Sequence, residues 1–158
     1  MSQDHEKSYA LGGPLPWFSA TLSVSHEQLD PQFITDILGI PPDRSTKRGV
    51  AAKSRTGRKL PEARLGMWTI EVPRSLSSEL DIAGAINNLL TRVEVPEELW
   101  LRALMHCPDA SARIFLGLRL DSFNRGFSLP SAIVQRLARR HLTLDFDLYA
   151  SGPADLFP

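Results

Sequence analysis

The fold is decided by residues 18–39, which read FSATLSVSHEQLDPQFITDILG. In residues 18–25 apolar side chains alternate with Ser and Thr, and a period of two with one apolar face is typical of a half-buried β-strand. A helix is expected next, because Asp30 is a good N-cap residue and Pro31 is tolerated at the first helical position. Gly39 is expected to end this helix, because glycine is common just after the last helical residue. These residues therefore predict a strand followed closely by a helix.

Both patterns recur along the chain. Further strands are expected at 67–72, 112–121 and 142–149, and further helices at 78–93, 96–105 and 129–139. A strand is the alternative for 96–105, because its apolar run is short. Ser78 is the expected N-cap of the 78–93 helix, and Val134 is expected to point inward. Each strand has one apolar and one polar face, which predicts an α+β fold: an open-faced two-layer sandwich whose mixed sheet has about four strands and helices on one face.

The two ends of the chain share a pattern of strand, Pro-initiated helix and strand. Pro31, Ile34 and Leu38 have the spacing of Pro130, Ile133 and Leu137. This spacing follows either from an internal repeat, which would give two βαβ-like halves, or from the capping rules that all helices obey.

Length and composition favour a single domain. We expect a flexible leader at 1–16, one α+β domain at 17–150 that contains a basic loop at 43–65, and a C-terminal tail at 151–158. The 18 basic and 18 acidic residues balance, so no overall field attracts nucleic acid or anionic lipid. No apolar run could span a membrane, and the polar N-terminus does not resemble a signal peptide. With the single cysteine, Cys107, this predicts a cytoplasmic protein.

The basic loop is the most unusual segment. Its cations are Arg44, Lys47, Arg48, Lys53, Arg55, Arg58, Lys59 and Arg64, against the acids Asp43 and Glu62. A structureless connection of this length is usually functional or disordered. Its charges suit an acidic protein surface or phosphates, but no aromatic residue lies between Arg44 and Arg64 to stack on bases. The loop therefore favours a protein partner over nucleic acid.

The polar sheet face supplies a second group of candidates: Arg119, Asp145, Asp147 and Tyr149. Asp145 and Asp147 share one strand face at about 7 Å, a spacing that suits a divalent ion or a glycosidase-like pair. Arg113 and Arg119 on the preceding strand could instead pair with these carboxylates, and that structural role is favoured.

Motifs for other chemistries are missing from the sequence. There is no Gly-x-Ser-x-Gly elbow, Walker loop or Gly-x-Gly-x-x-Gly turn, and the four histidines are too scattered for a zinc site. His106 and Cys107 are expected at a helix end with a buried thiol, and Trp17, Trp68 and Trp100 in the core. We predict no catalytic residue, no metal and no cofactor.

Several short motifs together resemble a known family. They are Leu29-Asp30-Pro31, Ile34, Leu38-Gly39, Ser45, Lys47-Arg48-Gly49, Gly66, Trp68 and Asp145-Phe146-Asp147-Leu148-Tyr149. Over roughly residues 18–149 the chain resembles the bacterial domain-of-unknown-function family numbered 4279. The resemblance implies a small cytoplasmic bacterial protein without an assigned activity, and it carries over no catalytic residue. The stretch between Gly49 and Trp68 is long and basic beside the family's pattern.

These observations predict a non-catalytic protein-interaction module, of which an immunity or antitoxin-like protein is one version. Its partner would be another protein with an acidic surface. The alternatives are a nucleic-acid-binding protein that uses residues 44–64, and an enzyme or ion binder that uses Asp145 and Asp147. A homodimer through the open sheet face is also compatible with the sequence.

Overall fold

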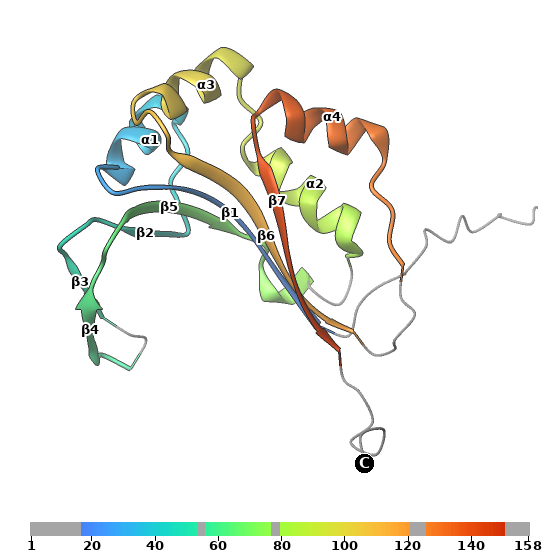
Figure 1. The fold of residues 1–158 in the computed structure, drawn as a ribbon, viewed down its shortest axis with the longest axis horizontal. Helices are drawn as coiled ribbons and strands as arrows, with labels where there is room; N and C mark the ends of the chain where they lie inside the picture. Colours follow the sequence, from blue (N-terminus) through green and yellow to red (C-terminus); the bar gives the residue numbers. More distant parts are fainter. Residues whose placement is uncertain (1–16, 54–55, 77–79, 121–125, 151–158) are drawn as a thin grey trace, which may run out of the picture.

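The computed structural model describes residues 17–53, 56–76, 80–120 and 126–150. Figure 1 shows two layers, with the helices all on one side of a curved sheet. The sheet contains five strands in the order β2-β5-β1-β6-β7. This is the predicted open-faced α+β sandwich, with one strand more than the expected four.

The long strand β1 (Trp17–His26) lies at the centre of the sheet. It pairs antiparallel with β5 (Gly66–Glu71) on one side and with β6 (Ser111–Leu120) on the other. The edges of the sheet are β2 (Arg44–Thr46) and β7 (Thr143–Ala150).

Only the second half of the described chain contains a βαβ unit. Strands β6 and β7 are parallel neighbours, and α4 (Ser131–Arg139) connects them. In the first half, α1 (Pro31–Leu38) follows β1, but the next long strand, β5, runs antiparallel to β1. The expectation of two βαβ-like halves is therefore wrong for the first half, because equal capping patterns do not determine strand direction.

The helix boundaries follow local capping. Asp30 accepts a hydrogen bond from the Gln32 backbone N–H, and Gly39 ends α1 in the left-handed region at φ 67°. The helix α2 (Ile82–Arg92) begins later than predicted, because Asp81 accepts a hydrogen bond from the Gly84 N–H at 2.7 Å and so provides the cap. The expected cap Ser78 lies outside the described residues. Residues 96–105 form a helix rather than a strand, α3 (Glu97–Met105), and a short 3-10 turn, η1 (Arg74–Leu76), precedes α2.

The core lies between the sheet and the helices. Trp68 and Trp100 are fully buried, as expected, and each indole has a partner: Trp68 donates to Thr35 Oγ1 at 3.2 Å, and Trp100 donates to the Arg140 carbonyl at 2.9 Å. Trp17 is not in the core, since 47% of it is exposed. It precedes the buried Phe18 on the same strand, and successive side chains of a strand point to opposite faces.

Two further expectations about the core are wrong. Val134 is 48% exposed, because α4 buries only Ile133 and Leu137. On β7, Phe146 and Leu148 remain 38% and 54% exposed although they alternate like buried residues. As β7 is an edge strand, its apolar side chains have neighbours from the sheet on one flank only.

The predicted loop 43–65 is ordered over most of its length. Strand β2 joins the edge of the main sheet beside β5, and β3 (Ala51–Lys53) pairs antiparallel with β4 (Lys59–Glu62). The Gly49 N–H donates to the Ala63 carbonyl at 2.9 Å, which links both ladders into one long ribbon. We call residues 47–65 the β-arm. The expectation of a structureless loop was wrong, because antiparallel pairing satisfies backbone groups that the sequence alone leaves without partners. The β-arm projects away from the two-layer body (Figure 1).

No helix among the described residues is long and apolar enough to cross a membrane.

Candidate binding face

The uncovered face of the sheet has a floor of small polar side chains. Strand pairing places Thr21 of β1 between Glu71 of β5 and Phe115 of β6, and it places Ser23 between Thr69 and Arg113. Thr69 is 3% exposed and its Oγ1 has no hydrogen-bond partner. The floor is therefore polar, as predicted, and no helix covers it, although Ser23 and Thr69 are themselves buried.

A shallow depression of about 590 Å³ lies on this face. The side chains that line it on the open side come from Trp17, Ser19, Thr21, Arg44, Glu71, Arg74 and Phe115. Gly117 keeps the space beside it free, because a Cβ at that position would approach Ser19 Oγ to 2.8 Å. Two aromatic residues thus share the lining of the depression with two arginines.

Ion pairs hold the rim of the depression. Arg44 Nε lies 2.8 Å from Glu71 Oε1. Next to them, Asp43 accepts two hydrogen bonds from the Arg92 guanidinium, at 2.6 and 2.8 Å, and a third from the Glu71 N–H. The bonds from Arg92 lower the pKa of Asp43, although partial burial opposes this. Asp43 therefore ties the start of β2 to β5 and to the end of α2.

Several cations predicted to meet a partner form ion pairs within the chain. Lys47 Nζ lies 2.7 Å from Asp30, and Arg48 lies 3.0 Å from Glu27. The hydrogen bond from Lys47 lowers the pKa of Asp30. Together with Arg44, these residues fasten the base of the β-arm to the domain.

The other predicted cations lie toward the tip of the β-arm. Arg58 is exposed. Lys53 and Lys59 face each other in the backbone register of β3 and β4. Their side chains, and the whole of Arg55, lie outside the described residues. The strand register therefore places Lys53 and Lys59 in the β-arm, and sequence position alone assigns Arg55 to it.

The predicted sheet-face residues come together on β6 and β7. Arg113 lies 3.4 Å from Asp145, so the expected cross-strand pair forms. Asp147 accepts a hydrogen bond of 2.6 Å from the Tyr149 hydroxyl, which raises the pKa of Tyr149. Arg119 sits beside Trp17 and Tyr149 in the strand register. Both carboxylates thus have protein partners, and the described residues contain no cluster of three or more metal-ligand side chains.

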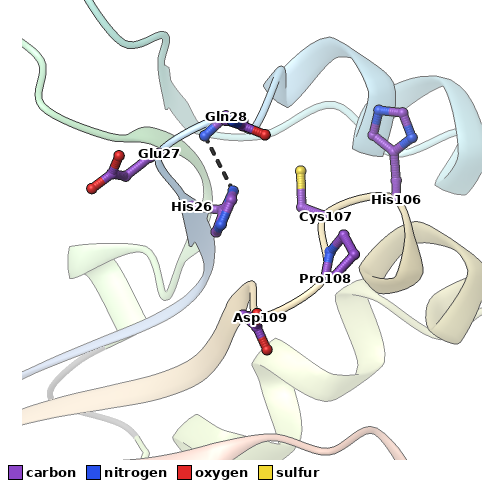
Figure 2. A pocket seen from close by; sticks show the side chains of 7 residues that line it. All are labelled: His26, Glu27, Gln28, His106, Cys107, Pro108 and Asp109. Carbon is purple, nitrogen blue, oxygen red and sulfur yellow. Dashed lines mark hydrogen bonds between the residues drawn. The ribbon is translucent and has the colours of Figure 1, made fainter.

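A second hollow, of about 530 Å³, lies where β1 ends and α3 turns into β6 (Figure 2). His26, Cys107 and Asp109 line it, a grouping that no spacing in the sequence indicates. The Gln28 N–H donates to His26 Nδ1 at 3.1 Å, and burial raises the pKa of the Cys107 thiol. A protonated thiol is a weak nucleophile. His106 follows α3 and stacks on Phe33, with ring centroids 3.3 Å apart. Cys107 comes next in the chain and is buried, so it is the buried thiol at a helix end that the sequence predicts.

Fold and surface together define an open-faced two-layer α+β domain, with an aromatic and cationic depression on its uncovered sheet face. The chain belongs to the family described as Domain of unknown function (DUF4279), whose model matches residues 16–151. No curated protein and no solved structure gives a significant match.

Proposed function

We propose that this chain is a non-catalytic, cytoplasmic protein-interaction module of bacterial origin that receives its partner on the open sheet face. The observation that carries the proposal is the depression with Trp17, Phe115, Arg44 and Arg74 in its lining. Trp and Arg are enriched among the residues that contribute most to protein–protein binding. An exposed Trp at the rim of a polar face is the kind of anchor that such interfaces use.

The chemistry of the depression favours a partner with an acidic surface. Arg44 and Arg74 line it, and the β-arm with its basic sequence follows β2 at that edge of the main sheet. Charges of this kind increase association rates and select orientation. An immunity or antitoxin-like role is one concrete version, and it rests on analogy with other small binding domains.

A photocrosslinking experiment tests this proposal. A benzophenone amino acid replaces Phe115 in one variant and Met105, which is 77% exposed, in a control variant. Met105 lies on α3 in the helical layer, so the control reports collisions with the other side of the molecule. Irradiation in lysate of the source cells after nuclease treatment should give a discrete protein adduct from position 115 only. Adding Trp17→Ala to the first variant should weaken that adduct. Equal adducts from both positions would contradict the proposal.

Single-stranded nucleic acid is the second candidate, because the structure exposes a stacking surface that the sequence did not indicate. Trp17 and Phe115 could stack on bases while Arg44 and Arg74 contact phosphates. Anisotropy titration with a labelled oligonucleotide separates the two candidates. Binding through phosphates must weaken steeply as the salt concentration rises, and it must be lost in Trp17→Ala.

An enzyme or ion-binding role for Asp145 and Asp147 has less support. Arg113 and the Tyr149 hydroxyl already contact these carboxylates. Calorimetry with divalent metal ions would reveal such a role as binding heat that Asp145→Asn removes.

A further inference from the structure

The two edges of the main sheet are built differently. The β2 edge is three residues long and follows Pro41 and Pro42. Proline and short length are common devices that stop an edge from recruiting another strand. The β7 edge is eight residues long, contains no Pro or Lys, and pairs with β6 in an unbroken register. No strand among the described residues pairs with its outer side. The β7 edge therefore lacks the proline and the short length that protect the β2 edge, and Asp145 and Asp147 are its charged side chains.

The side chains of β7 present a regular pattern on the two faces of that edge. Phe146 and Leu148 point to the helical side and remain 38% and 54% exposed. Phe146 is in contact with Phe127, with ring centroids 5.2 Å apart. Asp145 and Asp147 point to the open side. An added strand would therefore meet apolar groups on one face and carboxylates on the other.

A second copy of this chain fits the edge poorly in the register that places Phe146 opposite Phe146. In an antiparallel pair of β7 strands centred on Phe146, Asp145 of each copy would face Asp147 of the other. Like charges directly opposite one another destabilise a sheet. The same positions suit Lys or Arg, because an ionised carboxylate has several acceptor sites and can accept more than one donor: Asp145 lies 3.4 Å from Arg113, and Asp147 lies 2.6 Å from the Tyr149 hydroxyl.

We propose that the outer edge of β7 binds an extended segment of a partner protein that alternates basic and apolar residues. The segment would add a sixth strand through backbone hydrogen bonds, which is a recurring mode of peptide recognition. Its cations would lie beside Asp145 and Asp147, and its apolar side chains beside Phe146 and Leu148. Asp145 neighbours Phe115 in the strand register, but no β7 residue lines the depression, so this proposal does not require the function proposed above.

The test uses the full chain and a fluorescein-labelled peptide amide that alternates Lys and Val. We expect the wild-type chain to bind it, and to ignore both a Glu/Val peptide and a fully N-methylated Lys/Val peptide. Amide exchange measured by NMR should slow along Thr143–Ala150. Binding that survives N-methylation, or protection confined to other strands, would overturn the proposal.

Charge reversal supplies the second arm of the test. Asp145→Lys with Asp147→Lys should weaken Lys/Val binding by about tenfold or more and create binding to the Glu/Val peptide. Asp147→Lys alone leaves the Arg113–Asp145 pair intact and should show a smaller loss, which keeps the test decisive where the double variant does not fold. Asp36→Lys with Glu98→Lys changes the net charge equally in the helical layer and should bind like the wild type.

Two further outcomes are decisive. Arg44→Ser should keep peptide affinity, because Arg44 lines the depression from β2, at the opposite edge of the sheet. A loss of affinity in this variant would assign peptide binding to the depression and overturn the proposal. A wild-type dimer in sedimentation, with amide protection on β7, would identify a second copy as the occupant and also overturn it.

Discussion

Gly66 shows how one residue controls the approach of two elements. It begins β5, and a Cβ built there would collide with the carbonyl oxygen of Leu29 in the turn before α1. The obstacle is backbone, so no side-chain rotation could relieve it. The contact explains why the smallest residue stands where the β-arm returns to the sheet.

Gly66→Ala should therefore destabilise the fold. We expect the free energy of unfolding to fall by about 2–3 kcal/mol, since overpacking of this kind forces a backbone shift. Urea unfolding followed by circular dichroism measures the loss. Gly126→Ala is the matched control, because no atom lies within 4 Å of a Cβ there, and it should change stability by less than about 0.5 kcal/mol. Equal effects of the two changes would contradict the collision.

Asp43 makes a prediction about acid stability. Hydrogen bonds from Arg92 lower its folded pKa below the ordinary value of 3.8, so it stabilises the fold above that value and loses this contribution as the pH falls through the folded pKa. Asp43→Asn should cost roughly 1 kcal/mol near neutral pH, a modest figure because both side chains are about one third exposed. The difference from wild type should shrink in acid. Thermal unfolding from neutral to acidic pH checks this, and a difference independent of pH would refute it.

At the scale of elements, the β-arm stands outside the core. Among the residues whose burial the structure describes, none of the core comes from 47–65, and the base of the β-arm is held by ion pairs such as Lys47 with Asp30 and Arg48 with Glu27. Surface ion pairs of this kind contribute little to stability. The β-arm therefore contributes little to the stability of the core.

Replacing residues 51–62 by an Asn-Gly turn tests that separation. Val50 and Ala63 are already hydrogen-bonded across the ribbon, so a two-residue hairpin can close it. We expect helix and strand content to be retained and the melting temperature to change by less than about 4 °C, which corresponds to under about 1 kcal/mol. The crosslink from position 115 should weaken, because the tip cations are gone. Loss of cooperative unfolding would show that the β-arm supports the core.

Elements with a long sequence pattern could be predicted more accurately than short ones. Strand β1 and helix α1 could be predicted to within a residue, because eight alternating residues and a capped helix leave one interpretation. Strands β2 and β3 could not, because three residues carry no periodicity, and their stability comes from partners far along the chain. The β-arm was therefore mistaken for a loop.

At the scale of the whole molecule, the balanced total charge conceals an uneven surface. The open face carries the depression with Trp17 and Phe115, whereas β7 offers an edge with exposed apolar groups and carboxylates. These two surfaces could serve two segments of one partner or two different partners. The peptide and crosslinking experiments address them separately.

By itself the sequence determined the layers: the alternation in the strands and the stripes in the helices specify which residues are buried, and Trp68 and Trp100 followed that rule. Only the tertiary structure decided the direction of β5, the exposure of Trp17, the pairing of the basic residues and the meeting of His26 with Cys107. The physical reason is the separation along the sequence over which each interaction acts. Burial patterns and caps act between residues close in the sequence, whereas strand order and ion pairs join residues that only the folded chain brings together.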